Sequence, residues 1–141
     1  MKKPTDIFQF LTIKKKTHYI DADSTIRQAL EKFDYHKFSV VSMLDKNGVF
    51  VSTVSEGDIL RYIKNNARFD ISRAENVLVK DIEKYRPYKA VLLSAPMDEV
   101  LNVIMDQNFV PVTDDRGVYS GIIKRKTVIE YLYKNAVKIE E

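Results

Sequence analysis

The sequence contains no cysteine and no tryptophan, and only four glycines and four prolines in 141 residues. Without cysteine, the chain cannot form disulfides or bind a metal through thiolates. With so few glycines it also lacks a glycine-rich phosphate loop and a nucleophile elbow. We therefore expect neither a catalytic residue nor a metal site.

Long hydrophobic runs and an excess of one charge are missing as well. No apolar run approaches the roughly 20 residues of a transmembrane helix, and the N-terminal segment "MKKPTDIFQFLTIKKKTHY" lacks the continuous apolar core of a secretory signal. We therefore expect a cytoplasmic protein without a membrane partner. The net charge of +3, from 23 basic and 20 acidic residues, is too balanced to indicate nucleic-acid binding.

An internal repeat organises the chain. Apolar residues with the spacing of an amphipathic helix occur in both halves, 71 positions apart (97 − 26): Ile26, Ala29, Leu30 and Phe33, then Met97, Val100, Leu101 and Ile104. Phe38 matches Phe109 at the same offset. After a length difference of two residues, assigned to the turns "SMLDKNG" and "TDDRG", Gly48 matches Gly117. Each half thus predicts a strand, a helix, two strands joined by a tight turn, and a closing helix.

Local signals place the boundaries of these elements. Asp23 or Ser24 is the expected N-cap of the first helix, and Ser94, with Pro96 just inside the helix, caps its counterpart. The polar segment "KNNARFDISRAENVLVKDIEKYRPYK" predicts a linker with a short helix around residues 79–84. We expect two domains, residues 1–66 with an N-terminal helix and residues 67–141 with the linker. The predicted fold class is α/β (α+β), with two β-α-β-β-α units packed about a pseudo-twofold axis.

The second part of each unit, "FSVVSMLDKNGVFVSTVSEGDILRYI" and "FVPVTDDRGVYSGIIKRKTVIEYL", resembles a tandem pair of cystathionine-β-synthase (CBS) domains, the Bateman module. The resemblance extends over residues 6–133, and its most specific element is a strand ending in Ser/Thr-x-x-Asp at a helix start, here Ser55 and Asp58. It implies a non-catalytic regulatory module that senses an adenosine-containing ligand such as AMP, ADP, ATP, S-adenosylmethionine or cyclic di-AMP. The effector would bind in the cleft between the repeats, with no further cofactor.

The junction at Ser55 and Asp58 allows two interpretations. A helix N-terminus can bind phosphate, and a carboxylate one turn further on can accept hydrogen bonds from both ribose hydroxyls. The resemblance implies that Asp58 binds the ribose and that Ser55 supports ribose or phosphate. Alternatively, the two residues form a capping box, in which Ser55 caps the helix and Asp58 accepts a hydrogen bond from the Ser55 amide.

The resemblance also implies a position for the base, between two strands. The residues at these positions are Thr17, His18 and Tyr19 on one side, and Phe38, Ser39 and Val40 on the other. Strand periodicity alone explains Phe38 and Val40 as core residues. His18 and His36 have no partner at a metal-ligand spacing, so we expect them to be lone surface histidines or histidines satisfied within the fold.

The second half departs from the family pattern. Thr127 replaces the ribose carboxylate and follows three cations, Lys124, Arg125 and Lys126. Because cations oppose the dipole at a helix N-terminus, we expect a phosphate there, from the nucleotide whose ribose Asp58 binds. The alternative is that the cations are solvated and the helix begins later, with Thr127 as its cap. Gly121 matches a family glycine that lets the backbone approach the ligand, whereas the first half has Ser52 there.

A ligand-free module is the competing function. In that case the pair dimerises, or docks on a regulated enzyme or transporter, without binding a nucleotide. The resemblance implies a homodimer formed through helices of both repeats. The apolar faces of "DILRYI" and "TVIEYL" are the surfaces that we expect it to bury.

Overall fold

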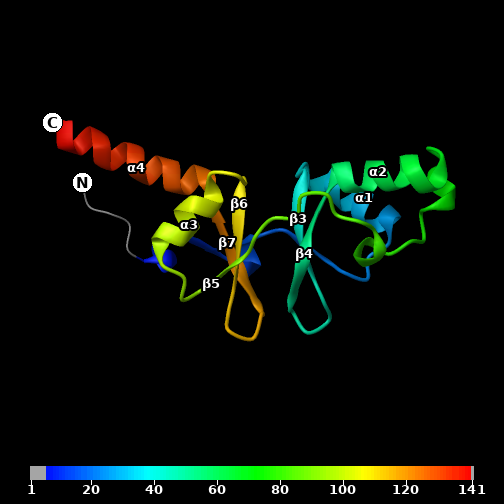
Figure 1. The fold of residues 1–141 in the computed structure, drawn as a ribbon, viewed down its shortest axis with the longest axis horizontal. Helices are drawn as coiled ribbons and strands as arrows, with labels where there is room; N and C mark the ends of the chain where they lie inside the picture. Colours follow the sequence, from blue (N-terminus) through cyan, green and yellow to red (C-terminus); the bar gives the residue numbers. More distant parts are fainter. Residues whose placement is uncertain (1–5, 141) are drawn as a thin grey trace. The chain divides into compact units, whose positions relative to one another are not determined.

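The computed structural model describes the backbone of residues 6–140 and the side chains of residues 6–136. Residues 1–5 of the first predicted domain and residue 141 of the second lie outside this range. The chain forms two compact units, each with its own sheet and hydrophobic core (Figure 1). We call residues 18–87 the repeat 1 unit, and residues 6–17 together with 88–140 the repeat 2 unit.

The repeat 1 unit contains the predicted strand, helix, two strands and helix. In order they are β2 (Tyr19–Asp21), α1 (Ile26–His36), β3 (Val40–Leu44), β4 (Phe50–Ser55) and α2 (Glu56–Ala67), followed by the 3-10 turns η3 (Ile71–Arg73) and η4 (Val79–Asp81). The central strand β3 is parallel to β2 and antiparallel to β4. Phe33 of α1 and Ile59 of α2 belong to one core cluster with Val41 and Met43 of β3, so both helices cover the same face of the sheet.

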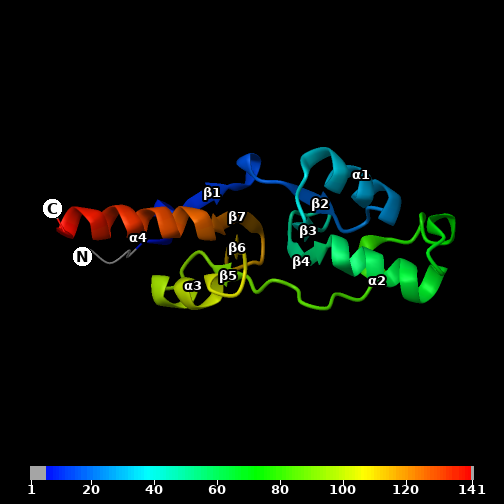
Figure 2. The ribbon, with the colours of Figure 1, turned by 90° about the horizontal axis from the view of Figure 1, so that it is seen from above.

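The repeat 2 unit has the same order of elements and one additional strand. It contains η1 (Ile7–Gln9), β1 (Leu11–Ile13), η2 (Lys14–Lys16), β5 (Val91–Leu92), α3 (Met97–Ile104), β6 (Phe109–Thr113), β7 (Tyr119–Lys124) and α4 (Arg125–Glu140). Here β6 is parallel to β5 and antiparallel to β7, and β1 lies antiparallel beside β7 at the edge of the sheet (Figure 2). The predicted β-α-β-β-α order is confirmed in both halves, and the fold is α+β. Among residues 6–140, no helix is long and hydrophobic enough to cross a bilayer.

The structure divides the chain differently from the predicted boundary between residues 66 and 67. Ile7 and Phe10, expected in the first domain, lie in the core of the repeat 2 unit. The linker residues Val79 and Ile82, expected in the second domain, lie in the core of the repeat 1 unit. Both pairs have the same spacing of three, so the duplication includes these anchoring segments. The expected N-terminal helix is a single 3-10 turn, in which the Asp6 side chain accepts a hydrogen bond from the Phe8 amide.

The two hairpin turns are identical in length and in hydrogen bonding. Asp45 Oδ1 accepts hydrogen bonds from the amides of Asn47 and Val49. In the second turn, Asp114 Oδ1 accepts hydrogen bonds from the amides of Arg116 and Val118. Gly48 and Gly117 close the turns with φ of 80° and 83°. The prediction that the halves differ in length within these turns is therefore wrong.

The length difference lies instead before the hairpin. Val40 is paired with Ser55, and Phe109 is paired with Lys124, so Phe109 corresponds to Val40 and not to Phe38. Helix α1 has 11 residues and α3 has 8, while the loop that follows has three residues after α1 and four after α3, which leaves a net difference of two. The sequence pattern predicted the wrong pairing of positions, because Phe38 and Phe109 are the same residue type and each begins an apolar run.

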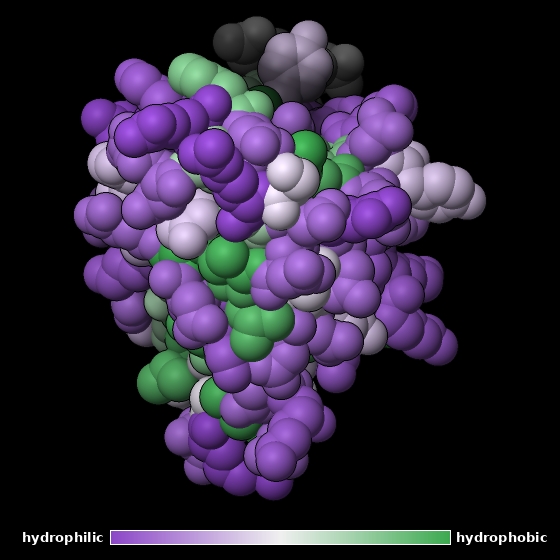
Figure 3. Space-filling model, turned by 90° about the vertical axis from the view of Figure 1, so that its right-hand side faces the viewer, coloured by the Kyte–Doolittle hydropathy of each residue, from purple (hydrophilic) through white to green (hydrophobic). Residues whose placement is uncertain are grey.

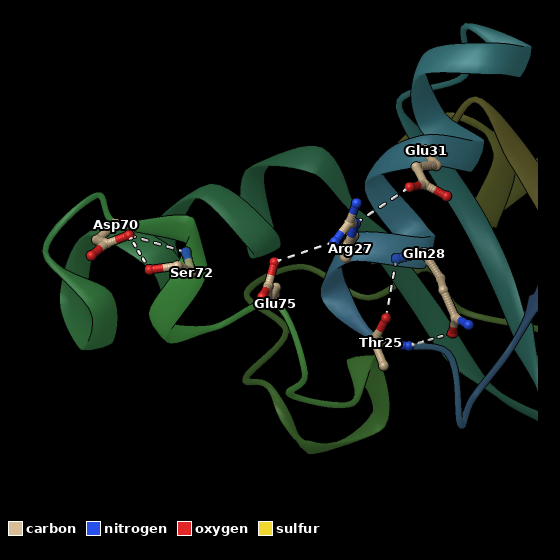
Figure 4. A network of polar contacts seen from close by, with 7 residues as sticks. All are labelled: Thr25, Arg27, Gln28, Glu31, Asp70, Ser72 and Glu75. Carbon is tan, nitrogen blue, oxygen red and sulfur yellow. Dashed lines mark hydrogen bonds and ion pairs between the residues drawn. The ribbon is translucent and has the colours of Figure 1, made fainter.

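The helix starts also differ from the predicted ones. Thr25, not Asp23 or Ser24, caps α1, and it forms a capping box with Gln28 (Figure 4). Asp23 is instead ion-paired with Lys80 at 2.7 Å, while the Ser24 carbonyl accepts the amide of Val79. These two residues therefore fix the linker turn η4, the short helix expected near residue 79, which ends at Asp81.

The second predicted cap, Ser94, is wrong as well. Pro96 occupies the N-cap position of α3 and offers no side-chain hydrogen bond. Asp98 and Glu99 follow in the first turn, where negative charge is favourable beside the helix dipole. At the start of α3, acidic side chains therefore stabilise the helix in place of a hydroxyl N-cap.

Gly121 is required by strand pairing rather than by a ligand. Its φ is 149°, and a Cβ atom built on it would lie 2.1 Å from the carbonyl oxygen of Thr12 in β1. Ser52, at the corresponding position of β4, lies in a sheet whose described strands are β2, β3 and β4, so no strand equivalent to β1 excludes its side chain. The glycine therefore allows β1 to join β7.

Replacing Gly121 by alanine should weaken the repeat 2 unit. We expect Gly121→Ala to lower the free energy of unfolding by about 1 to 3 kcal/mol, because β1 has to move or the backbone has to carry strain. Gly57→Ala is the matched control, since its Cβ would meet only side-chain atoms at 3.4 and 3.5 Å. Urea denaturation monitored by circular dichroism measures both variants. Equal stabilities would contradict the assignment.

Candidate functional site

The junction between β4 and α2 is a capping box. The Asp58 amide donates to Ser55 Oγ at 3.0 Å, and the Ser55 amide donates to Asp58 Oδ2 at 2.9 Å. Ser55 has extended backbone angles and is the N-cap of α2, with Asp58 three residues on. The capping-box interpretation of this motif is therefore confirmed as local geometry, and it leaves the second carboxylate oxygen available for another partner.

That second oxygen contacts the linker. Asp58 Oδ1 accepts a hydrogen bond from the Tyr85 amide at 3.1 Å, and an Arg61 guanidinium nitrogen lies 3.9 Å from it. The Asp58 side chain is only 5% exposed. A small cavity of about 30 Å³ beside it is lined by Asp58, Arg61, Tyr62, Asn65, Asn66, Glu83 and Tyr85. The carboxylate is thus buried at the positive end of a helix, and three groups of one unit surround it.

The residues expected at the base position fall into three groups. His18 and Phe38 are in ring contact, with centroids 5.6 Å apart. Ser39 and Val40 adjoin the Ser55 junction, since the Glu56 amide donates to the Ser39 carbonyl and Val40 is paired with Ser55. Tyr19, in β2, is 37% exposed.

Thr17 is placed apart from this group, because it belongs to the repeat 2 unit. Its hydroxyl donates to the Lys14 carbonyl at 2.7 Å and accepts a hydrogen bond from Tyr119 Oη at 2.9 Å. The structure therefore uses this hydroxyl to fix η2 on the edge of the repeat 2 sheet.

The two histidines lie on the surface, as expected, but they contact each other. The rings of His18 and His36 lie 4.2 Å apart, and His36 also stacks on Phe38 at 5.7 Å with an interplanar angle of 9°. Both histidines are exposed. Eighteen residues separate them in sequence, and the extension of α1 brings them together. Among the side chains of residues 6–136, no three metal-binding groups lie close enough to hold an ion.

In repeat 2, Arg125 has a structural partner. Its Nε donates to the carbonyls of Ile104 and Gln107, both at 2.9 Å, beyond the last turn of α3. Helix α4 begins at Arg125, so the alternative of a later start capped by Thr127 is wrong. Lys124 and Lys126 are exposed beside a groove of about 630 Å³ that also includes Phe109 and Ile129. Two of the three cations are therefore available to an anion.

Sequence reasoning missed Gln107. This side chain is 7% exposed, and it bonds to both the amide and the carbonyl of Lys89 and to the carbonyl of Phe109. It occupies the position of Phe38 in the structural register, so a polar clamp in repeat 2 replaces the aromatic cluster of repeat 1. A glutamine between two apolar segments was the only signal in the sequence.

A family model for the CBS domain matches the chain twice, over residues 7–65 and 79–134. The chain belongs to the CBS domain family. Two matches in one chain, each covering one β-α-β-β-α set, make it a tandem CBS pair. The capping-box junction of Ser55 and Asp58 lies within the first CBS repeat, and the Lys124–Thr127 segment lies within the second.

Known proteins with similar sequence or structure agree with this assignment. An inosine-5'-monophosphate dehydrogenase from Nitrosopumilus maritimus (strain SCM1) is 26% identical over 122 residues, which are 84% of this chain and 23% of that protein. The chain thus spans about a quarter of the length of this relative.

Two solved structures share the fold of the CBS pair. The CbpB protein of Listeria monocytogenes, in complex with c-di-AMP, superposes with a TM-score of 0.82 at 18% identity, over 92% of this chain and 96% of that chain. CBSX2, in complex with AMP, has a TM-score of 0.70 at 22% identity, over 98% and 100% of the two chains.

The contacts of Arg125 predict that it stabilises the fold, unlike its lysine neighbours. We expect Arg125→Ala to lower the free energy of unfolding by about 1 to 3 kcal/mol, because two carbonyls at the end of α3 lose their donor. Lys126→Ala should change it by less than about 0.5 kcal/mol, since this side chain is exposed. Chemical denaturation compares the two variants. Equal effects would contradict the anchoring role.

Proposed function

We propose that the chain is a regulatory module that binds an adenosine-containing nucleotide and has no catalytic activity of its own. Membership in the CBS family supports a regulatory role, and two proteins of the same fold are known in complex with c-di-AMP and AMP. The nucleotide is of the AMP, ADP or ATP class, with c-di-AMP as the alternative. The cytoplasmic location stays a prediction.

The observation that carries this proposal is the buried carboxylate of Asp58 at the start of α2. A carboxylate has about four acceptor positions, and two are used by the amides of Ser55 and Tyr85. A ribose diol can donate to the remaining positions, and to the position of the Tyr85 amide where that amide gives way, and such bonds to an ionised acceptor are strong. The CBS pattern assigns the ribose to this aspartate, with Ser55 beside it.

The surroundings of Asp58 suit a base in the same unit. His18 and Phe38 present aromatic rings, and Tyr19, Ser39 and Val40 complete the set that the family pattern indicates. An adenine ring can stack on such side chains. Thr17, which is engaged with Tyr119, is the weakest member of the set.

For the phosphate, the geometry favours Lys124 and Lys126 over Arg125. Both lysines are exposed at the N-terminus of α4, where the helix dipole also attracts an anion. Arg125 is held by two carbonyls, and Thr127 is the third residue of the helix. We propose that the two lysines bind a phosphate group at the start of α4.

A ligand-free docking module is the second candidate, and an exposed apolar groove favours it. The groove, of about 530 Å³, lies between α3 and α4 and is lined by Leu101, Ile104, Met105, Arg125, Val128, Ile129 and Leu132. Met105 and Ile129 are 70% and 55% exposed. By contrast, the face over the α1 and α2 end of the repeat 1 unit is mainly hydrophilic, with hydrophobic residues only in small groups (Figure 3).

Substitution of Asp58 tests the nucleotide proposal. We expect Asp58→Ala to weaken the binding of adenosine and AMP alike, by about ten- to a hundredfold, because the bonds to the ribose are lost. The same change removes a capping box, so Thr25→Ala, which removes the equivalent box of α1, is the matched control. Both variants should lose about 1 kcal/mol of stability, but only Asp58→Ala should lose affinity in calorimetric titration. Unchanged affinity in Asp58→Ala would overturn the proposal.

The oligomeric state tests the docking surface. Burial of the α3–α4 groove in an isologous homodimer should produce a dimer at tens of micromolar in sedimentation equilibrium. The dimer is expected whether or not a nucleotide binds. Its presence would therefore distinguish a docking module from a nucleotide sensor that has no protein partner. A strict monomer at that concentration would contradict the homodimer. A regulated enzyme or transporter would then be the partner to seek.

A further inference from the structure

The linker crosses the N-terminal end of α2 and contacts the proposed ribose carboxylate. We call residues 83–85 the strap. The Tyr85 amide donates to Asp58 Oδ1 at 3.1 Å, and the Arg61 guanidinium lies over the Tyr85 ring, 4.3 Å from its centroid. Arg61 is also 3.9 Å from Asp58. Backbone, cation and ring therefore close over one carboxylate.

The closed arrangement leaves no room for a sugar. The Asp58 side chain is 5% exposed, and the cavity that the strap forms beside it has a volume of about 30 Å³. Such a cavity holds about one or two water molecules, which is far less than a ribose needs. A ligand that reaches Asp58 from this side therefore has to displace the strap.

The strap is anchored at its first end, and the chain is held again only at Lys89, by the Gln107 clamp of the repeat 2 unit. Ile82, just before it, is 3% exposed in the core, and Lys84 Nζ donates to the Val79 carbonyl at 2.6 Å. Burial lowers the pKa of the Lys84 ammonium, in agreement with a position against the protein surface. Tyr85 is 47% exposed, and Arg86 and Pro87 are exposed after it. Tyr85 can thus swing away without disturbing the core.

The segment of repeat 2 that corresponds to the strap is a paired strand. Ile7 and Phe10 correspond to Val79 and Ile82, so β1 corresponds to residues 83–85. β1 pairs with β7 over three residues, whereas the strap is not part of the repeat 1 sheet. Repeat 2 has Thr127 where repeat 1 has Asp58. The strap, which has no strand pairing to hold it, therefore belongs to repeat 1, the repeat that carries the Asp58 carboxylate.

We propose that the strap is an internal competitor for Asp58, so that nucleotide binding is coupled to release of the linker. The inference rests on the proposed function. In the closed state the Tyr85 amide occupies the acceptor that a ribose hydroxyl takes in the open state. The apparent affinity is then the intrinsic affinity reduced by the fraction of open molecules. Release of the linker is the conformational change that a regulated partner can detect.

Removal of the Tyr85 amide tests the competition. Tyr85→Pro has no N–H to donate, and it should bind adenosine about tenfold more tightly than the wild type in calorimetric titration. Tyr85→Phe keeps the amide and the ring, and it should bind like the wild type. If the wild type and both variants bind adenosine with equal affinity, the proposed competition between the strap and the ligand is overturned, and the proposed function is left intact. No binding by any of them would overturn the proposed function itself.

A second measurement does not depend on the folding of the proline variant. In wild-type protein, hydrogen exchange at the Tyr85 amide should be slow without ligand and accelerate at least about tenfold with saturating adenosine. The Ser55 amide, which bonds to the other oxygen of Asp58, is the internal control and should stay protected. A Tyr85 amide that stays equally protected in the complex would overturn the competition.

Discussion

The carboxylate of Asp58 is a charge in a nearly water-free position, and it has to be satisfied by protein donors. Burial of an unpaired charge is costly, so the surrounding segments are arranged to supply those donors. The Ser55 amide begins α2, the Tyr85 amide holds the linker, and Arg61 adds a cation. A strand end, a helix start and a linker therefore meet at one side chain. A ligand that supplies better donors can displace the linker and leave the strand end and the helix start in place.

Because of the duplication, the two halves have the same fold. The candidate site depends on the residues in which they differ. Both repeats have the same hairpin, closed by Asp45 and Gly48 in one and by Asp114 and Gly117 in the other. At the helix start after the hairpin they diverge completely. One repeat has an acid that faces inward, and the other has cations, of which Arg125 is tied to backbone carbonyls. The repeats thus offer different chemistry, a buried carboxylate in one and exposed lysines in the other.

Local patterns predicted the order of elements and the capping box, because helix periodicity, turn residues and caps act over a few positions. The sequence did not indicate which unit each flanking segment joins, since the short apolar runs around Ile7 and Val79 could pack against either sheet. Nor did it indicate the pair of His18 and His36 or the anchoring of Arg125, because these contacts join residues about 20 positions apart. The Tyr85 contact, 27 residues from Asp58, was hidden for the same reason.

The central claim is that Asp58 recognises the ribose diol of a nucleotide. Calorimetric titration of the wild-type protein with adenosine and with 2′-deoxyadenosine tests it most directly, because the two ligands differ only in one hydroxyl. Loss of one hydrogen bond to a buried carboxylate should weaken binding of the deoxy compound by at least about tenfold. Equal affinity for the two nucleosides would contradict the account.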